Sequence, residues 1–393
     1  MRNMENIRAK KLDRHTLYPN ARKLYSGGKA VVWGSVSLLR IKTTMKSRKN
    51  ARKRESIGQG VLEMINVDRI TEKVLDTVMS HELSEGAYAR WTIPAEGTAR
   101  NMGVNEYGCA DAANILYTLG AFVREPEVRA KWVKTMRDMQ DPATGLFSEP
   151  THHTIHTTAH LTAALELFDA LPRYPLSALY RYRDRDELYA LLESLDWEGN
   201  PWPMSHRGAG LFAALTITRS VDLEWQDWYF SYLRSHCDPD YGMSYRGRIG
   251  RDIPAHHMYG WFHYLFNHVY ARRPIPYPEK LIDSCIEMYL EDRMGAPFGV
   301  TCGFMEIDWV FCMNRASRET AHRRDEVKAL LRDFAGKYTR YLMDADPKTD
   351  RSFDDLHMLF GAMCCLSELQ LALPGEIVST VPLKNVLDRR PFI

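Results

Sequence analysis

The chain has 393 residues, of which 45% are hydrophobic and 26% are charged. This length and apolar share suffice for one large domain or two ordinary ones, and they exclude a disordered chain and a small disulfide-stabilised scaffold. The net charge of +2 conceals an uneven distribution, because residues 1–54 carry 16 Lys and Arg against 2 Asp and Glu. The seven cysteines are odd in number and scattered along the chain, which is typical of a reducing compartment.

The N-terminal segment, residues 1–66, is predicted to be a basic extension of an acidic body. Its cations at 46–54 suit an anionic membrane surface, RNA or an acidic partner, although such clusters are often only solvated. The apolar run at 30–39 is about half as long as a membrane-spanning helix requires, and no secretory signal is recognisable. We therefore expect a cytoplasmic protein, at most peripheral to a membrane, and we do not expect nucleic acid as a partner.

The body, residues 67–372, repeats one pattern along its length. Six points where a polar loop gives way to an apolar helix follow one another at intervals of 46 to 51 residues. These points are Asp111, His160, His206, His257, Asp308 and Asp355. An amphipathic stretch with charges at helical spacing precedes each point. These stretches cover residues 70–83, 127–139, 176–195, 223–234, 280–290 and 324–343.

Six helices that are apolar on nearly all faces, alternating with six that keep one charged face, predict an all-α fold: an (α/α)6 toroid of six helical hairpins. The apolar helices would line the axis and the amphipathic ones would surround them. An open solenoid of six hairpins has the same local pattern. However, its terminal repeats need a polar outer face, and here the terminal helices are as apolar as the central ones. Residues 373–393 are predicted to be a C-terminal tail.

One loop has a recognisable sequence. Residues 140–147 read Gln-Asp-Pro-Ala-Thr-Gly-Leu-Phe, and residues 238–242 form a degenerate copy. With the helical alternation over residues 68–372, this loop resembles the outer-to-inner turn of two groups of α/α toroids. One comprises the six-hairpin glycosidases and related polysaccharide lyases, and the other the terpenoid cyclases and prenyltransferases. The resemblance implies the fold but no catalytic residue, because neither the Asp-x-Asp-Asp motif of the class II cyclases nor the prenyltransferase zinc motif has a match here.

In such a toroid the loops that enter the inner helices meet at one mouth, so residues about fifty apart in the chain become neighbours. Nine of the 14 histidines lie at these openings or one turn beyond them. The expected catalytic residues are Asp308, Asp111, Asp355, His160 and His257. The expected substrate-binding residues are His206, Arg207, Tyr107, Trp202, Tyr245, Tyr259, Trp309, Glu306 and His357.

These residues favour a carbohydrate-active enzyme that acts on an oligosaccharide or glycan. Hydrolysis needs two carboxyl groups, and Asp308 with Asp111 or Asp355 would supply them, although the latter two also suit helix capping. His206 and Arg207 suit a uronic acid, and aromatic rings suit sugar stacking. Because histidine removes carbon-bound protons near neutral pH, elimination or epimerisation at a uronate is equally open.

Other functions remain open. A terpenoid cyclase or prenyltransferase would use an Asp such as Asp355 to protonate an alkene within an aromatic-lined cavity. A toroid without catalytic activity would only bind a ligand. No cofactor is expected. However, His156 and His160 lie four residues apart on one helix, and with Asp308 or His357 this spacing also permits a zinc site.

Overall fold

The computed structural model describes residues 64–95, 100–247, 249 and 254–392, together with Asn50, Lys53, Arg54 and Ile57. These residues all belong to one compact unit, Asn50–Ile393. The basic extension predicted for residues 1–66 therefore lies almost entirely outside the described residues.

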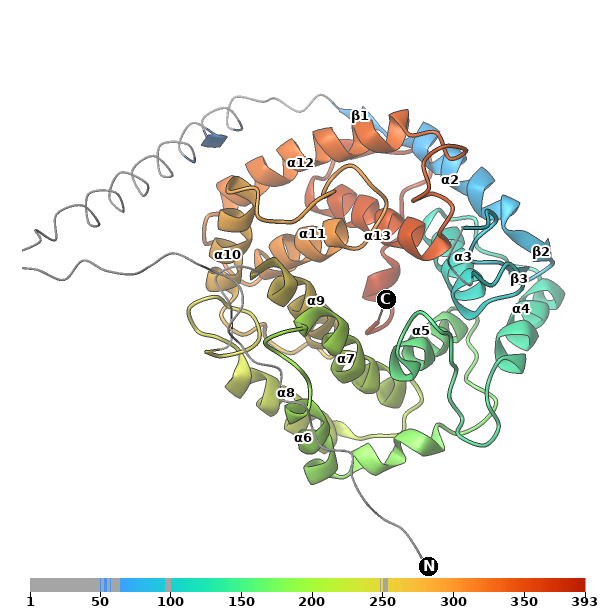
Figure 1. Ribbon diagram of the computed structural model, residues 1–393. Coiled ribbons are helices and arrows are strands. Elements are labelled where there is room, and N and C mark those ends of the chain that lie inside the picture. Colours follow the sequence, from blue (N-terminus) through green and yellow to red (C-terminus); the bar gives the residue numbers. More distant parts are fainter. Residues whose placement is uncertain are drawn as a thin grey trace, which may run out of the picture. The chain divides into compact units, whose positions relative to one another are not determined.

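The described residues are mostly helical, which confirms the predicted all-α fold. The helices form two layers, one inside the other (Figure 1). The inner layer consists of α3 (Glu106–Thr118), α5 (Thr154–Leu167), α7 (Pro201–Ile217), α9 (Pro254–Tyr270), α11 (Met305–Ala316) and α13 (Leu356–Ala372). The outer layer consists of α2 (Asp68–Ser80), α4 (Pro126–Asp138), α6 (Arg185–Glu193), α8 (Leu223–His236), α10 (Pro278–Leu290) and α12 (Arg324–Asp344).

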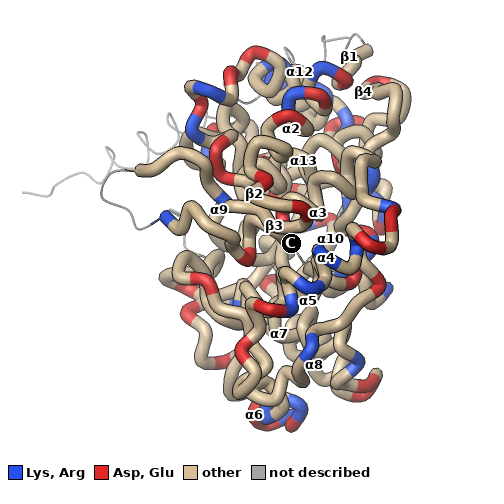
Figure 2. The backbone as a smooth tube through the Cα atoms, turned by 90° about the vertical axis from the view of Figure 1, so that its right-hand side faces the viewer, with Lys and Arg blue, Asp and Glu red and all other residues tan. Residues whose placement is uncertain are grey.

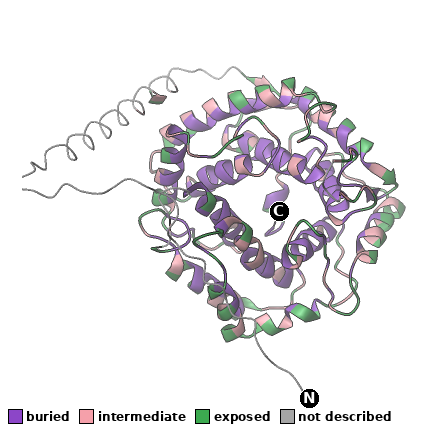
Figure 3. Ribbon diagram, viewed as in Figure 1, coloured by how far each residue is buried: buried purple, intermediate pink, exposed green. Residues whose placement is uncertain are grey.

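Burial follows the amphipathic pattern of the sequence. The inner helices are buried on nearly all sides, whereas the outer ones show alternating buried and exposed residues (Figure 3). In α4, for example, only Trp132 and Met136 are buried. Residues of both charges lie along the outer helices α6 and α12 (Figure 2). Helices that are apolar all round need such a second layer, because each exposed Å² of apolar surface costs about 25 cal/mol.

The inner helices form a closed circuit. Each packs against the next, and α13 packs against α3. Small residues allow close approach: a Cβ atom at Gly361 of α13 would lie only 2.5 Å from the carbonyl oxygen of Gly303. The two ends of the unit also meet, because β1 (Ile65–Asn66) pairs in parallel with β4 (Ile377–Val378). An open array of hairpins would lack these contacts between its first and last members.

The predicted loop copies adopt the same turn. The side chains of Asp141 and Asp238 each accept the backbone N–H two residues further on, at 2.9 Å. The N–H groups of Gly145 and Gly242 then donate to the carbonyl oxygens of these aspartates at 2.8 Å, and both glycines have positive φ. Asp346 forms a third such side-chain bond, at 3.0 Å, in a turn that the sequence analysis did not recognise.

Most inner helices begin earlier than predicted. Asn105 and His153 cap α3 and α5 by accepting backbone N–H groups of the first turn. Asp111 and His160 therefore lie in the second turn, and Asp111 caps nothing. Asp355 does cap its helix, because its side chain accepts a first-turn N–H at 3.0 Å.

The shorter elements connect the layers. The hairpin of β2 (Glu82–Ser84) and β3 (Ala87–Tyr88) leads from α2 to α3. The stretch predicted as one helix at 176–195 is divided into a 3-10 helix, η1 (Ser177–Arg183), and α6, because Asp184 caps α6 by accepting two backbone N–H groups. All seven cysteines are buried and unbridged. Within the described ranges, no helix combines the length and apolarity needed to cross a bilayer.

The tail predicted at residues 373–393 enters the ring. It includes β4 and the 3-10 helix η2 (Val386–Asp388). The N–H of Lys384 donates to the carbonyl oxygen of Thr118, the last residue of α3. Further along, the side-chain amide of Asn267 in α9 donates to the carbonyl oxygen of Pro391 at 2.9 Å. The chain thus passes the C-terminal ends of the inner helices and closes the axis from that side (Figure 1).

Candidate functional site

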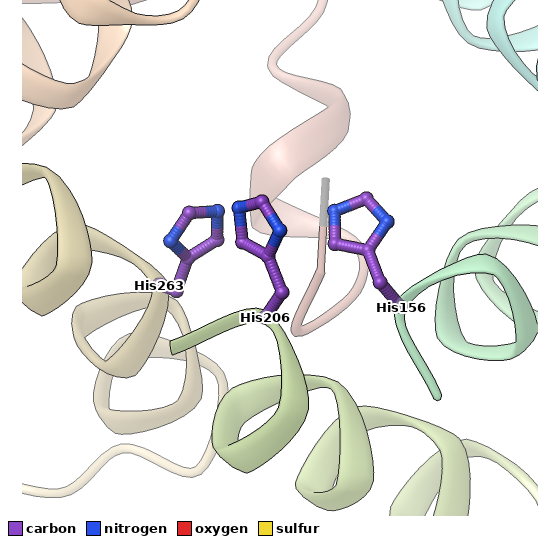
Figure 4. Close-up of side chains that lie close together, drawn as sticks. All are labelled: His156, His206 and His263. Atoms are coloured by element: carbon purple, nitrogen blue, oxygen red, sulfur yellow. The ribbon is translucent and has the colours of Figure 1, made fainter. Parts of the chain in front are cut away.

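Two clusters of ionisable side chains converge from neighbouring inner helices. The Asp111 cluster consists of Asp111 of α3, His160 of α5 and His357 of α13. The three-histidine cluster consists of His156 of α5, His206 of α7 and His263 of α9 (Figure 4). Within each cluster, one nitrogen or oxygen atom of every residue lies within 4.8 Å of those of the other two. All six residues lie within the first three turns of their helices, on the side of the axis opposite the entry of the tail.

The carboxylate of Asp111 is hydrogen-bonded through both oxygens. Its Oδ1 lies 2.7 Å from Nε2 of His160, and its Oδ2 lies 3.1 Å from Nδ1 of His357. Burial opposes ionisation, but the two imidazoles outweigh it and hold the pKa of Asp111 well below its usual value. A carboxylate accepts hydrogen bonds only, so these two ring nitrogens carry the protons. Nδ1 of His160 and Nε2 of His357 are not used in these bonds, and in neutral His357 the latter carries a lone pair.

His357 is neutral near pH 7. Burial lowers its pKa to about 3, in spite of the opposing effect of Asp111. Nδ1 of His160 is buried and has no hydrogen-bond partner among the described residues. The Asp111 cluster therefore combines one buried carboxylate with two oriented imidazoles, each with a ring nitrogen that the carboxylate does not occupy.

Tyr107 connects the two clusters. It lies one turn before Asp111 in α3, and its hydroxyl is 2.6 Å from Nδ1 of His156 and 3.3 Å from Oγ1 of Thr157. Its ring centroid is 5.0 Å from that of His160 and 4.6 Å from that of His357. Burial raises the pKa of Tyr107 well above its ordinary value, so the phenol stays protonated.

The three-histidine cluster consists of neutral imidazoles. Burial, followed by the proximity of other histidines, holds the pKa values of His156 and His206 well below the ordinary value. Burial lowers the pKa of His263 to about 3. Neutral imidazole nitrogens and carboxylate oxygens are common ligands of transition metals. Each cluster therefore has the residue types to hold a metal ion.

Arg90 forms a bidentate ion pair beside the Asp111 cluster. Its Nε and Nη2 donate to the two carboxylate oxygens of Asp355 at 2.7 and 3.0 Å. Its guanidinium carbon lies 5.0 Å from the ring centroid of Tyr107. Both oxygens of Asp355 are occupied by Arg90, and one of them also caps α13, which does not favour its expected catalytic role. No sequence pattern indicates Arg90, because it lies in a connecting segment without a motif.

Arg207 lies beside His206 on α7 and is half-buried. Its Nε is buried without a hydrogen-bond partner among the described residues. The pKa of His153, the N-cap of α5, is lowered by burial and also by the charge of Arg207. Arg207 is thus a cation next to His206 on α7 whose buried Nε has no partner in the described part of the chain.

The tail forms the other boundary of the three-histidine cluster. The ring centroid of Phe392 lies 4.9 Å from that of His156 and 6.2 Å from that of His263. Nη1 of the buried Arg390 donates to the carbonyl oxygen of Ala163 at 2.8 Å. The sequence analysis singled out neither residue, because the tail has no helical period from which its course inside the ring could be predicted.

Asp308 and Glu306 occupy a separate buried environment. Neither carboxyl oxygen of Asp308 has a partner among the described residues, and burial raises its pKa well above the usual value. Glu306 accepts the N–H of Gly299 at 2.7 Å, and burial raises its pKa to about 7. Within the described ranges, no hydrogen bond or ion pair joins either residue to Asp111 or Asp355. The contacts therefore do not assemble the expected pair of catalytic carboxylates.

Replacing Glu306 with Gln should change how stability depends on pH. The pKa of Glu306 is near 4.5 in the unfolded state and about 7 in the folded state. The unfolding free energy of the wild type therefore decreases as the pH rises through this interval. Between pH 4.5 and 7, the unfolding free energy of Glu306→Gln should rise by roughly 3 kcal/mol relative to that of the wild type. Above this interval the difference should stay constant. Urea unfolding at a series of pH values measures this difference. The exposed Glu287→Gln in α10 is the control, and a variant curve parallel to the wild type would refute the burial effect.

Two of the expected substrate-binding residues pack against the outer layer. The indole N–H of Trp309 donates to the carbonyl oxygen of Cys285 in α10 at 3.1 Å, and its ring stacks on Tyr289 at 4.7 Å. The hydroxyl of Tyr245 donates to Glu193 in α6 at 3.1 Å. These rings stabilise contacts between the layers, and no described contact joins them to either cluster.

The remaining expected residues lie near the starts of α7 and α9. Nδ1 of His257 lies 2.8 Å from the carbonyl oxygen of Ser244, while its Nε2 is buried without a described partner. Trp202 and Tyr259 contact each other with ring centroids 4.8 Å apart. These three residues line the same end of the inner layer as the clusters. The backbone of Tyr259 is hydrogen-bonded to His263, but no described side-chain hydrogen bond joins any of the three to a cluster.

The zinc set expected from sequence is divided between the clusters. His156 and His160 share a face of α5, as their spacing predicts. However, His160 bonds to Asp111, and His156 lies beside His206 and His263. Local spacing cannot show which neighbouring helix each histidine meets. No family model, curated protein or solved structure matches this chain.

Proposed function

We propose that the chain is an acid/base enzyme that removes a carbon-bound proton from a uronate-containing glycan at the Asp111 cluster. The observation that carries this proposal is the pair of hydrogen bonds from His160 and His357 to the buried Asp111. A carboxylate that accepts the N–H of an imidazole fixes its tautomer and orients the opposite nitrogen. His357 is neutral at physiological pH and is thus in the protonation state that a base requires.

The proton to be removed lies on the carbon next to the uronate carboxylate. Nε2 of His357 takes this proton, and the electron pair of the C–H bond delocalises into the carboxylate. In elimination, the pair forms a C=C bond, the neighbouring C–O bond breaks, and the leaving oxygen takes up a proton from water. In epimerisation, water supplies a proton to the same carbon from the opposite face. In both cases His357 then releases the proton it took to the solvent. Asp111 is a positioning residue for either outcome, because it touches only the histidines.

Hydrolysis by two carboxyl groups fits the arrangement less well. Such a mechanism needs one protonated and one ionised carboxyl group on either side of the scissile bond. Asp111 has a lowered pKa and both oxygens occupied, so it cannot serve as the acid. Asp355 is held by Arg90, and no described contact joins Asp308 to the cluster.

Arg207 supports an anionic substrate. A guanidinium with an unpartnered donor suits a carboxylate, which accepts charge-assisted hydrogen bonds. Neutralising the substrate carboxylate also makes the adjacent C–H bond more acidic, so the same contact would serve binding and proton removal. His206, on the preceding position of α7, lies at the same opening.

The proposal predicts deuterium exchange on polyuronates. In D2O, the full chain should introduce deuterium at the carbon that bears the carboxylate, or form a conjugated double bond seen by ultraviolet absorbance, with pectate, alginate or a glucuronan. Arg207→Ala should raise KM for the responding polymer by about tenfold or more, because a charge-assisted contact contributes about 1.5–3 kcal/mol. The exposed Arg234→Ala in α8 is the matched control and should not change KM.

Release of reducing ends without exchange or a double bond would contradict the proposal, because this is the result expected of a hydrolase. Neutral glucans of similar length serve as the substrate control. Exchange on these polymers equal to that on polyuronates would contradict the role assigned to Arg207.

A further inference from the structure

The three-histidine cluster gathers its rings from three successive inner helices, α5, α7 and α9, and the rings face one another (Figure 4). One nitrogen of each ring lies within 4.8 Å of one nitrogen of the other two. In a tetrahedral site with Zn–N bonds of about 2.0–2.1 Å, the ligand nitrogens are about 3.4 Å apart. Small rotations of the rings would therefore place all three nitrogens around a single ion.

Hydrogen bonds orient two of the rings for this purpose. The hydroxyl of Ser205 donates to the carbonyl oxygen of Trp202 at 2.5 Å, so its oxygen is left to accept from Nδ1 of His263, 3.0 Å away. Nε2 of His263 then carries a lone pair. Nδ1 of His156 similarly lies 2.6 Å from the hydroxyl of Tyr107. Histidines that bind metals in proteins are usually held by such a bond to the second ring nitrogen.

His206 completes the set without a hydrogen bond of its own. None of the described residues is a hydrogen-bond partner of its ring nitrogens, although the ring lies between those of His156 and His263. No described hydrogen bond joins the three imidazoles to one another, so their lone pairs have no partner within the cluster. A cation would supply that partner.

The Asp111 cluster is the competing candidate, and its geometry argues against it. The atoms of Asp111, His160 and His357 that approach one another are already joined by hydrogen bonds of 2.7 and 3.1 Å. A metal ion would have to break both bonds and displace two protons. The three-histidine cluster loses no described hydrogen bond between its members when it takes up an ion.

We propose that His156, His206 and His263 bind one zinc ion per chain. Zinc accepts three imidazole nitrogens readily, and three protein ligands leave a fourth position for water or substrate. Phe392 lies against His156 and His263 on the side of the tail, whereas His206 is half-buried. Placing a uronate carboxylate in this position is a further step that depends on the proposed function, whereas zinc binding does not.

Zinc content measures the site directly. The full chain is treated with a chelator, loaded with Zn²⁺ and freed of excess metal. The zinc bound per chain is then measured by elemental mass spectrometry. We expect one equivalent in the wild type and less than about a tenth in His206→Ala, because two imidazoles hold zinc far more weakly than three. Zn²⁺ should also raise the unfolding temperature of the wild type but not that of His206→Ala. Co²⁺ in place of Zn²⁺ should give the intense visible bands of tetrahedral coordination.

Further variants show whether a loss of zinc comes from the missing ligand or from misfolding, and which of the two clusters binds the ion. His206→Gln keeps most of the side-chain volume and should lose zinc as His206→Ala does. The exposed His256→Ala in α9 and the buried His160→Ala in the Asp111 cluster should each keep one equivalent. A wild type that holds no zinc after loading overturns the proposal. Retention by both His206 variants, or a loss in His160→Ala equal to that in His206→Ala, also overturns it.

The role of the ion is tested by deuterium exchange before and after zinc removal. Loss of exchange on removal, with recovery on adding Zn²⁺, supports placement of the substrate carboxylate on the ion. Exchange that is unchanged by removal overturns that role. Absence of exchange even in the zinc-loaded chain contradicts the proposed function, and the zinc content remains a valid result.

Discussion

Replacing Asp111 with Asn is expected to reduce the rate of deuterium exchange by about 10²–10⁴-fold, the range that general acid–base catalysis contributes. The carboxylate accepts one N–H from His160 and one from His357. An amide has only one acceptor oxygen, and its NH2 group would face the second imidazole as a competing donor. One histidine must then change tautomer or rotate, which removes the base from its working orientation. The exchange rate at saturating polyuronate measures the effect.

The control for this variant is Asp138→Asn in α4, an exposed carboxylate paired with Lys134 and Arg173. Its exchange rate should equal that of the wild type. Circular dichroism should be used to test whether Asp111→Asn is folded. A folded Asp111→Asn that exchanges deuterium within about threefold of the wild type would show that Asp111 does not position the base.

Replacing Glu368 with Ala should be strongly destabilising. Glu368 of α13 accepts hydrogen bonds from Nε and Nη2 of Arg315 in α11, both at 2.6 Å, and both side chains are almost fully buried. Removing one partner leaves a buried guanidinium only partly compensated by the half-exposed Asp388. The expected loss is about 3–5 kcal/mol of unfolding free energy. Urea unfolding, with refolding checked for reversibility, provides the measurement.

Two further variants test whether the loss comes from the unpaired charge. The double variant Arg315→Met/Glu368→Leu removes both charges and should recover more than half of the loss, since apolar residues of similar volume often replace buried ion pairs at little cost. Glu166→Ala breaks the partly exposed pair with Arg389 and should cost at most about 1 kcal/mol. If Glu368→Ala were no more destabilising than Glu166→Ala, the buried ion pair would not stabilise the contact between α11 and α13.

The all-α fold could be predicted because the hydrophobic period and the composition of each segment determine its local structure. The alternation of wholly apolar with amphipathic helices separates the two layers, and the Asp-Pro turns at Asp141 and Asp238 mark where one layer passes to the other. Helix starts were less predictable. Asn105 and His153 cap their helices several residues before the expected openings, since an apolar stretch shows where a helix is buried and not where its first N–H groups are satisfied.

The candidate site was predicted only in part for a related reason. Asp111, His160, His206, His357 and Tyr107 were expected at one end of the ring, and the structure brings them together there. Asp308 occupies a similar place in its own repeat but does not join them. Both carboxyl oxygens of Asp308 are buried without a partner among the described residues, whereas Asp111 bonds to His160 and His357. The repeat period places both residues near a helix start but does not fix which neighbouring side chains they meet.

Closure of the inner circuit has a consequence for biosynthesis. The face of α3 that packs against α13 is made about 250 residues before its partner. At a translation rate of roughly 5–20 residues per second, this face waits some ten to fifty seconds on the ribosome before α13 can cover it. Its apolar residues are exposed to other nascent chains during that interval, which makes the unfinished protein a natural client for chaperones.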